Sequence, residues 1–344
     1  MKRPTMQDIA DEAGVNKCVV SHVLHDDAYA ATVRPQTRQR ILEIAERIGY
    51  RLNSLASAIR TGQVNTIAVI VKFDEWRSIV PLNQIMAGIM METARRKYGV
   101  KVFSDDDLDS TFRSIVENRI EKVISMSLDR PSRDKAAELA EKYSLDLVYA
   151  YERGHGKFPA VNVDNAEISA EIVHYLFGKG HSRIGLLCVP HRYHYIEDRH
   201  SGYLRGMSEC GLKVDPLWIS CSDDIGQSLE VMLALPQDER PTALVALSDS
   251  VAAKVESYAI RHSWRFPQDI SVVGIGDFDI ASQLSFPLTT MRESLQTTGQ
   301  LLVRLLMKEP LAMEPDAFNV FHTHAVLVER ESVFDITNQN RRSK

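Results

Sequence analysis

The sequence predicts an α/β protein with parallel sheets covered by helices on both faces, preceded by a small all-helical unit. From Asn65 onward, apolar runs rich in Val and Ile alternate with amphipathic stretches of helical period, which is typical of parallel sheets. Residues 1–50 instead contain short helical patterns separated by Gly or Pro. The 344 residues leave room for two or three domains. No apolar run approaches the ~20 residues that span a bilayer, so no membrane segment is expected.

The first helix is predicted to begin after Thr5. Thr5, followed three residues later by Asp8, forms a capping-box pattern in which each side chain bonds the other residue's backbone N–H. Gly14 then ends the helix. The apolar face of this helix contains Ile9, Ala10 and Ala13.

Two further short helices are predicted in the N-terminal unit. One covers residues 17–25 with Asn16 as its N-cap, and the other begins at Pro35 and ends at Gly49. They are expected to bury Val19, Val20, Val23 and Leu24, and Ile41, Leu42, Ala45 and Ile48, respectively. A helix, a Gly-containing turn and a short second helix form the helix-turn-helix geometry, in which the second helix reaches base edges in DNA. A helical bundle that packs on the rest of the protein explains the same spacing.

Residues 53–60 show a fourth, very short helical pattern with too little apolar surface to be stable alone. Such a helix forms only when something completes it, and the minor groove of DNA, opened by an apolar side chain, is one suitable partner. A linker that frays in solution is the alternative interpretation.

The body from residue 65 is predicted to bind a ligand at the carboxyl ends of its strands, where clefts form in parallel α/β sheets. Strands are expected at 67–71, 100–103, 122–126, 147–151, 184–188, 243–247 and 271–275. Helices between them are expected, for instance, at 84–98, 132–143, 168–177 and 250–262.

Composition and spacing favour a non-enzymatic protein of the cytoplasm. The net charge is −5, but residues 1–62 hold nine Lys and Arg against seven Asp and Glu. The scattered cysteines Cys18, Cys188, Cys210 and Cys221 suggest neither a metal site nor a disulfide framework. The segment PHRYHYIEDRH contains His191, His194 and His200, which are interpreted as solvated loop histidines, not as metal ligands. No phosphate loop or activated nucleophile is present, so no cofactor and no enzymatic activity are expected.

Several segments together resemble the lactose/galactose-repressor (LacI/GalR) family of transcription regulators. They are TMQDIADEAGVNKCVVSHVL, TRQRILEIAERIGYRLNSLASAI, VNVDNAEISAEIVHYLFGKGHSRIGLL, DRHSGYLRGM, RPTALVALSDSVAAKVESYAI, FPQDISVVGIGDFDIASQLSFPLTTM and VLVERESV. The resemblance covers nearly the whole chain in the family's order. It implies a helix-turn-helix domain at 1–51, a hinge helix and linker at 52–65, a two-lobed periplasmic-binding-protein-like core at 66–334 and a tail at 335–344. The chain is expected to cross between the lobes near residues 164, 290 and 325.

The resemblance also implies DNA contacts. Base contacts fall on Lys17, Cys18 and His22, phosphate contacts on Thr5, Asn16, Ser21 and Thr37, and minor-groove contacts on Asn53, Ala56 and Ile59, with Ile59 as the apolar wedge. His22 replaces the family's usual Arg and cannot make a bidentate bond to guanine, which implies a changed half-site. Leu52, Ser57 and Arg34 also depart from the pattern; Arg34 replaces the usual capping Ser of the third helix.

Arg199 matches the effector-binding Arg of the family. The other candidate ligand contacts follow predicted strands at their carboxyl ends: Lys72, Trp76, Ser248, Asp249 and Asp277, of which Asp277 either substitutes for the family's Asp or leaves that acceptor missing. A surface ion pair of Arg199 with Asp198 or Glu197, and a core position for Trp76, are the alternatives. Gly276 stands where the family commonly has an Asp that grips the effector. The effector is expected to be a sugar, a sugar acid or a phosphosugar; because Lys72 and Arg199 are basic and this Asp is missing, an anionic effector is the favoured hypothesis and a neutral sugar the alternative.

The resemblance therefore implies a ligand-responsive regulator, a repressor of a carbohydrate or sugar-acid utilisation operon. It would bind a pseudo-palindromic DNA operator as a homodimer, with half-sites about one helical turn apart. The helix at 84–98 is the expected dimer face, through Ile85, Met86, Ile89, Met90 and Met91. An effector-independent regulator and a sugar-sensing module without DNA binding are the alternatives.

Overall fold

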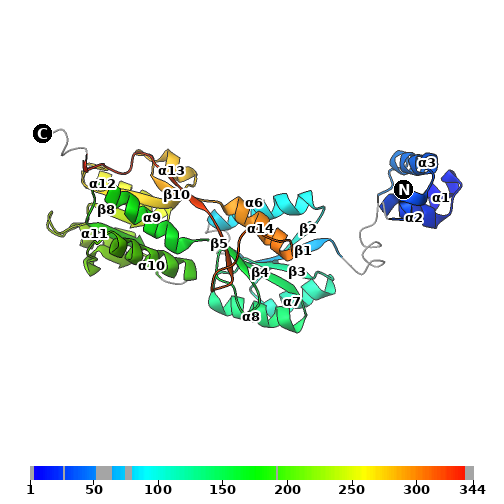
Figure 1. Cartoon of the computed structure of the whole chain (residues 1–344), viewed down its shortest axis with the longest axis horizontal. Helices are drawn as coiled ribbons and strands as arrows, with labels where there is room; N and C mark the ends of the chain where they lie inside the picture. The colour runs from blue at the N-terminus through cyan, green and yellow to red at the C-terminus, as the bar shows by residue number, and fades with distance from the viewer. Residues whose placement is uncertain (1–3, 26–27, 52–63, 74–79, 191–192, 338–344) are drawn as a thin grey trace. The chain divides into compact units, whose positions relative to one another are not determined.

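The computed structural model describes residues 4–25, 28–51, 64–73, 80–190 and 193–337. The chain divides into two compact units, Met1–Val64 and Asn65–Lys344 (Figure 1). Among the described residues, no helix combines the length and apolar character needed to cross a membrane.

The described residues of the N-terminal unit form three α-helices, as the sequence predicts, and one 3-10 turn that the sequence did not predict. They are α1 (Met6–Ala13), α2 (Lys17–His25), η1 (Ala30–Thr32) and α3 (Pro35–Arg47). The capping box is confirmed, because Thr5 N donates to Asp8 Oδ2 over 2.7 Å and Asp8 N donates to Thr5 Oγ1 over 3.3 Å. Gly14 ends α1 in the left-handed conformation, with φ 70°. Asn16 Oδ1 accepts the Cys18 N–H over 2.8 Å at the start of α2.

The core of this unit corrects one expectation for α3. Leu42 is 41% exposed, and Ile44 is buried instead. The helix places Ile41, Ile44, Ala45 and Ile48 toward α1 and α2, because positions three and four apart share a face whereas Leu42 is rotated away. Arg34 makes no side-chain cap at α3, in agreement with the loss of a capping residue there.

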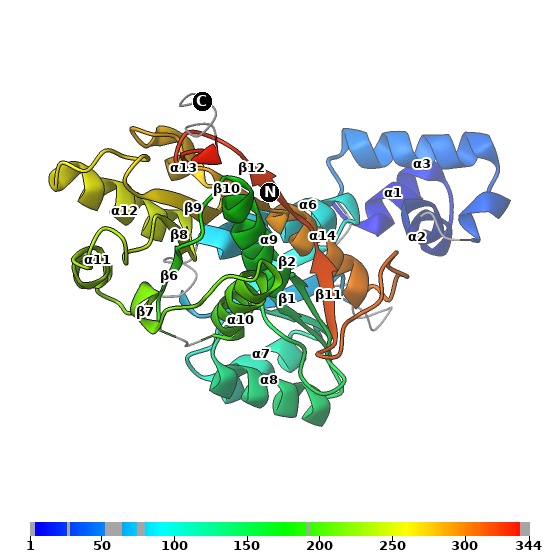
Figure 2. The same cartoon turned by 60° about the vertical axis from the view of Figure 1, so that its left-hand side comes forward.

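The second unit consists of two lobes, each built on a six-stranded sheet (Figures 1 and 2). Lobe 1 has the strand order β11-β5-β4-β3-β1-β2 and lobe 2 the order β12-β10-β9-β8-β6-β7. All pairings are parallel except that of β10 with β12, which the sequence did not indicate. The chain crosses between the lobes at Asp164, Ser294 and His324, the residues that separate the elements of one lobe from those of the other.

The elements of lobe 1 are β1 (Thr66–Val71), α6 (Val80–Arg95), β2 (Gly99–Ser104), α7 (Leu108–Glu117), β3 (Lys122–Ser125), α8 (Arg130–Lys142), β4 (Asp146–Ala150), β5 (Ala160–Val163), α14 (Leu295–Leu306) and β11 (Val320–Thr323). Those of lobe 2 are α9 (Asn165–Gly178), β6 (Ile184–Cys188), α10 (His194–Glu209), η2 (Pro216–Trp218), β7 (Ile219–Cys221), α11 (Ile225–Leu233), β8 (Ala243–Ala246), α12 (Asp249–Arg261), β9 (Ser271–Gly276), α13 (Asp279–Gln283), β10 (Thr290–Glu293) and β12 (Ala325–Val328). Each sheet has a separate hydrophobic cluster on each face.

Helix α6 packs closely on α14, which changes the interpretation of its apolar residues. Ile85, Met86 and Ile89 are buried in lobe 1, so they cannot form the expected dimer face. Met90 and Met91 are exposed on the same helix. Ile85, Met86 and Ile89 therefore belong to the core of lobe 1. Of the five residues predicted for the dimer face, Met90 and Met91 are the two that are exposed to a partner subunit.

The segment around the histidines is also corrected. His194 is the first residue of α10 and His200 lies within it, so neither is a loop residue. Within the described ranges, no cluster of His, Cys, Asp and Glu has a metal-binding arrangement. His191 lies outside the described residues.

Two cysteines form a disulfide that the sequence reading did not expect. Cys188 and Cys221 are register partners on the parallel strands β6 and β7, with their Cα atoms 4.4 Å apart, and they are joined by a disulfide. Cys18 and Cys210 are free thiols. Sequence spacing gave no hint, because the two strands are 33 residues apart and become neighbours only in the sheet.

Two glycines allow the close approach of α6 and α14, which lie side by side (Figure 2). A Cβ at Gly88 would lie 2.0 Å from the carbonyl oxygen of Gln296, and a Cβ at Gly299 would lie 2.1 Å from that of Ile85. Backbone atoms cannot yield as a flexible side chain can, so a larger residue at either position must push the helices apart.

We predict that Gly88→Ala lowers the free energy of unfolding by about 1–3 kcal/mol, the usual range for overpacking a packed contact. The matched control is Gly178→Ala at the end of α9, where a Cβ meets no atom within 4 Å. This control should change stability by less than about 1 kcal/mol, with a gain more common than a loss. Chemical denaturation measures both values, and equal stabilities of the two variants would contradict the packing account.

Candidate functional site

Helix α2 presents the residues predicted to contact bases on one polar surface. Lys17 and Cys18 are exposed, and Ser21 and His22 are partly exposed. The apolar residues Val20 and Val23 are buried against α1 and α3, which leaves the opposite side of α2 open to solvent. A short, capped helix with its polar side outward has the geometry to enter a major groove.

Tyr29 adds a residue to this surface that sequence reasoning missed. Its side chain is 54% exposed, and its ring lies 4.6 Å from the ring of His22 at a tilted angle. Because Tyr29 follows α2, outside the helix-turn-helix pattern, the only available signal was an aromatic residue in the turn of the small unit. Its contact limits the rotamers open to His22.

Some of the other predicted DNA contacts lie within the described residues, and the rest lie outside them. Thr5 is exposed before α1 and Thr37 is partly exposed in the first turn of α3, and Asn16 is exposed before α2. Thr5 and Asn16 also cap helices, so their side-chain oxygens already hold backbone N–H groups. Asn53, Ala56 and Ile59, together with the departures at Leu52 and Ser57, lie outside the described residues.

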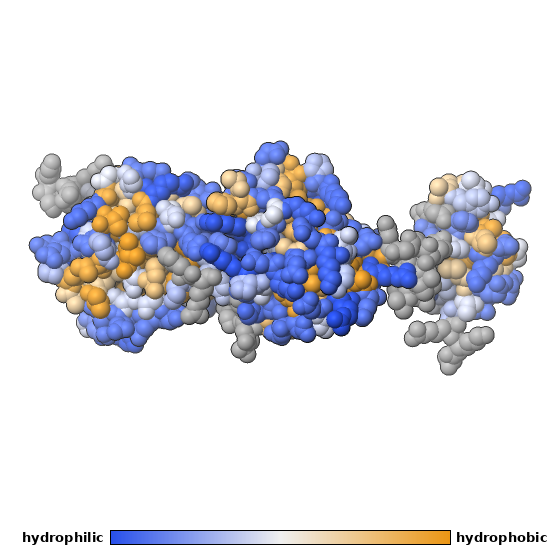
Figure 3. Space-filling model, turned by 90° about the horizontal axis from the view of Figure 1, so that it is seen from below, coloured by the Kyte–Doolittle hydropathy of each residue, from blue (hydrophilic) through white to orange (hydrophobic). Residues whose placement is uncertain are grey.

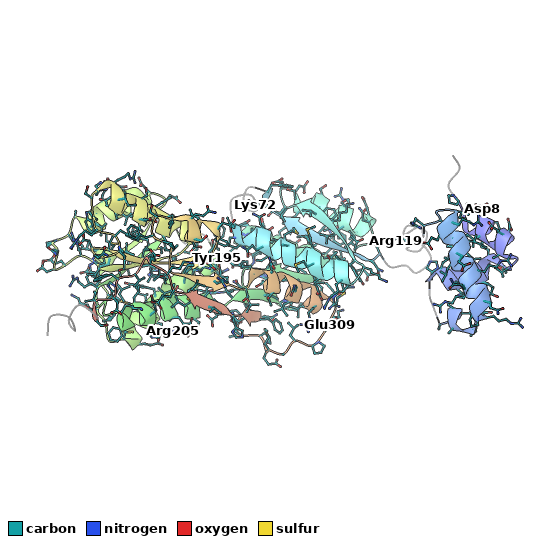
Figure 4. The ribbon with its side chains drawn as sticks, turned by 90° about the horizontal axis from the view of Figure 1, so that it is seen from above. Asp8, Lys72, Arg119, Tyr195, Arg205 and Glu309 are labelled. Atoms are coloured by element: carbon teal, nitrogen blue, oxygen red, sulfur yellow. A yellow bond between two sulfur atoms is a disulfide. The ribbon has the colours of Figure 1, made fainter. Side chains whose placement is uncertain are left out.

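A pocket of about 570 Å³ lies between the lobes of the second unit. Lobe 1 contributes Val80, Pro81, Gln84 and Tyr151; lobe 2 contributes Val189, Tyr195, Ile196, Arg199, Leu247, Ser248, Ser250, Val251, Ile275, Phe278, Asp279, Ile280 and Glu293. Figure 4 shows Tyr195 at the boundary of the two lobes. The volume suits a small organic ligand, and most of the wall is apolar or aromatic.

Arg199 is the predicted ligand contact whose place in the pocket is most informative. It is buried in α10, and its guanidinium donates to Glu293 Oε1 and Tyr151 Oη over 2.9 Å each. It also donates to Asn165 Oδ1 over 2.7 Å and to the Leu247 carbonyl over 2.8 Å. The alternative of a surface ion pair is wrong, because Asp198 pairs with Arg153 and Glu197 with Arg130.

The pKa shifts of this network follow from its burial. Burial raises the pKa of Glu293, and Arg199 and the Tyr151 hydroxyl oppose that rise. Burial also raises the pKa of Tyr151 well above its ordinary value, so its hydroxyl stays protonated and donates to Glu293 over 3.0 Å. Burial acts to lower the pKa of Arg199, but Tyr151 and Glu293 outweigh it and raise that pKa. The Arg199 guanidinium is thus a buried cation that is stabilised by the Glu293 carboxylate and the Tyr151 hydroxyl.

Ser248 lines the pocket, but the structure gives Asp249 and Asp277 other partners. Ser248 caps α12 and accepts the Val251 N–H over 3.2 Å. Asp249 is fully buried, and its carboxylate accepts from Thr290 Oγ1 over 2.5 Å and from the Phe278 N–H over 2.8 Å. Its role in this structure is to brace the loop after β9.

Asp277 is held by two arginines outside the pocket. Its carboxylate accepts from Arg292 Nε over 2.5 Å and from Arg330 over 2.6 Å. Burial acts to raise the pKa of Asp277, but the hydrogen bonds and charges of Arg330 and Arg292 outweigh it and lower that pKa. Asp277 therefore does not replace the acceptor that is missing at Gly276.

Lys72 follows β1 on lobe 1 and bonds Asp129 Oδ2 over 3.2 Å, so its charge is matched within the lobe. It is not among the described residues that line the pocket. Trp76 lies outside the described residues.

Polar contacts across the lobes surround the start of α10. Glu152 of lobe 1 is fully buried; its Oε1 accepts the backbone N–H of His194 over 2.9 Å, and its Oε2 bonds His194 Nδ1 over 2.7 Å. Tyr193, the N-cap of α10, makes no side-chain cap. A carboxylate from one lobe thus caps the helix of the other lobe that carries Arg199. Arg133 lies 3.4 Å from the same carboxylate.

A helix-turn-helix unit joined to a two-lobed α/β core with a ligand-sized pocket defines a DNA-binding transcriptional regulator of the ligand-responsive class. The family model for bacterial regulatory proteins of the lacI family matches residues 5–53, and the model for a periplasmic binding protein-like domain matches residues 173–333. The chain thus contains a helix-turn-helix domain of the lacI family and a periplasmic binding protein-like domain.

Relatives and solved structures agree with this assignment. The chain is 29% identical to the HTH-type transcriptional repressor CytR of Escherichia coli strain K12, over 89% of each chain. It is 26% identical to the ribose operon repressor of Haemophilus influenzae, over 96% of this chain and 98% of the relative. The fold matches the Lac repressor dimer bound to operator and the anti-inducer ONPF with TM-score 0.77 and 20% identity, over 97% of this chain and all of that chain.

We predict that Glu152→Ala lowers the free energy of unfolding by about 3–5 kcal/mol, because it leaves the buried Arg133 without its carboxylate and α10 without its cap. The matched control is Glu167→Ala, which removes an exposed ion pair with Arg205 and should cost less than about 1 kcal/mol. Both are measured by chemical denaturation. A Glu152 variant as stable as the Glu167 variant would show that the buried cap does not hold the lobes.

Proposed function

We propose that this protein is a homodimeric transcriptional repressor that binds a pseudo-palindromic operator and responds to a small carbohydrate-like effector in the pocket between its lobes. The observation that carries the DNA-binding part is the outward surface of α2, where Lys17, Cys18 and His22 are accessible while Val20 and Val23 hold the helix in the core. The repressors named among the relatives support repression as the sign of regulation. Binding to operator DNA would require a protein of the cytoplasm.

The DNA contacts act in two ways in this proposal. Lys17, Cys18 and His22 meet base edges, and Thr5, Asn16, Ser21 and Thr37 position the unit on phosphates. Asn53, Ala56 and Ile59 enter the minor groove, with Ile59 as a wedge between base pairs. A single imidazole at position 22 makes one hydrogen bond to a base edge, so it reads a different base from a bidentate arginine.

A homodimer provides the second half-site contact. Met90 and Met91 are exposed on lobe 1, and Val231 and Ile260 are exposed on α11 and α12 of lobe 2. Figure 3 shows apolar side chains gathered on one face of lobe 2. Exposed apolar side chains of this kind are typical of surfaces that pair with another subunit.

The pocket links the effector to DNA binding. Its lining comes from both lobes, so a ligand there contacts both and favours one arrangement of the lobes over another. A coupling of about 1–3 kcal/mol between ligand and operator is typical of such regulators. Ser248 and Arg199 are the proposed ligand contacts among the residues predicted from the sequence.

The test is selection of DNA bound by the full chain from a random pool, with and without a mixture of metabolites. We predict enrichment of a pseudo-palindrome, a steep loss of affinity with salt, and a changed base preference at one position of each half-site in His22→Ala. Lys101→Ala on lobe 1 is the control and should leave the selected sequence unchanged. A folded protein that enriches no sequence under either condition would contradict the proposal.

A further inference from the structure

The polar part of the pocket wall is already satisfied by the protein itself. Arg199 has five N–H groups, and four of them donate to Glu293, Tyr151, Asn165 and Leu247. At most one is left for a ligand. The Glu293 carboxylate accepts from Arg199 and Tyr151, so the charge of each partner is matched inside the wall.

The charges of the lining do not favour an anion. Arg199 is the one basic side chain among the described residues that line the pocket, whereas Glu293 and Asp279 both carry carboxylates. Lys72, which was expected to add a second positive charge, is paired with Asp129 instead. The described lining therefore has more negative than positive groups when its carboxylates are ionised.

An aromatic ring stands where a ligand-gripping side chain was expected at position 276. A Cβ at Gly276 would lie 2.2 Å from the ring of Phe278, and Gly276 has φ 133°, a conformation that other residues rarely adopt. Asp249 holds Phe278 in this place through its backbone N–H. The ring of Phe278 thus fills the space, and an apolar surface replaces a carboxylate in that part of the pocket.

We propose that the pocket selects an uncharged ligand, and that Glu293 is the specificity-determining residue that keeps sugar acids and phosphosugars out by occupying Arg199. The inference rests on the proposed role of the pocket as the effector site. An uncharged ligand replaces the anionic effector that the sequence favoured. That hypothesis treated the charges of Lys72 and Arg199 as available to a ligand.

The physical basis is the cost of separating the buried pair. An anion that approached Arg199 would compete with Glu293 for the same guanidinium. Two negative groups would then share one buried cation, and the displaced carboxylate would be left buried and without its partner. A neutral ligand uses the remaining N–H group of Arg199, the hydroxyls of Ser248 and Ser250 and the aromatic wall, and it leaves the pair intact.

The test compares the full chain with Glu293→Gln by calorimetric titration with inorganic phosphate and with gluconate. Glutamine keeps the shape of the side chain and removes its charge, so Arg199 becomes available to an anion. We expect no saturable binding by the unaltered protein and at least about tenfold tighter binding of one of these anions by the variant, equivalent to ~1.4 kcal/mol.

Two controls assign the gain to Arg199. In Arg199→Met combined with Glu293→Gln, the gain should disappear, and Glu167→Gln, which removes one of the two carboxylate partners of the exposed Arg205, should show none. Saturable anion binding by the unaltered protein that Arg199→Met abolishes would overturn the proposal, and so would a folded Glu293→Gln variant that gains nothing.

The fold of each variant is checked by circular dichroism. If Glu293→Gln does not fold, the proposal is decided by titrating the unaltered protein and the Arg199→Met variant with the same anions. Anion binding that is lost in Arg199→Met contradicts the proposal, and the absence of such binding supports it. Operator selection is scored separately in the same preparations. Loss of operator binding would overturn the proposed function, whereas the anion titrations alone decide the role of Glu293.

Discussion

The buried network of Tyr151, Arg199 and Glu293 is the interaction that joins the two lobes at the pocket. A charge removed from water is tolerated only when a partner and hydrogen bonds replace its solvation. Here the partners come from separate parts of the chain: Arg199 from α10, Glu293 from the end of β10, and Tyr151 from lobe 1 just after β4. Arg199 and Glu293 both belong to lobe 2, so the Tyr151 hydroxyl is the member of this network that joins the lobes, and it does so in the wall of the pocket.

The neighbouring contacts extend the same constraint. Glu152, the residue after Tyr151, caps α10 from across the lobes, and Arg130 and Arg153 of lobe 1 pair with Glu197 and Asp198 on that helix. The helix that carries Arg199 is thus held at its N-terminus by the opposite lobe. A ligand that moves one lobe relative to the other must change these contacts. The contacts at the start of α10 therefore couple the pocket to the arrangement of the two lobes.

The sequence predicted the elements whose signal is local. Apolar runs identified β1, β6 and β9, and the Thr5–Asp8 pattern identified the start of α1, because neighbouring residues decide strand burial and helix capping. Leu42 was misassigned because two adjacent apolar residues fit the helical period, and only packing against α1 and α2 separates them. Motif resemblance placed Arg199 in the pocket, but its partner Glu293 is 94 residues away and had no signal of its own. Distance along the chain also explains why the sequence did not predict the disulfide of Cys188 with Cys221 or the arginine partners of Asp277.

A double-mutant cycle between Tyr151→Phe in lobe 1 and Glu293→Gln in lobe 2 tests the central claim most directly. The free energy of unfolding is measured for the unaltered chain, both single variants and the combined variant. If the network joins the lobes, the two losses will be coupled by at least about 1 kcal/mol, as for residues within one hydrogen-bonded group. Losses that add to within ~0.3–0.5 kcal/mol would show that the residues act independently, and would contradict the account.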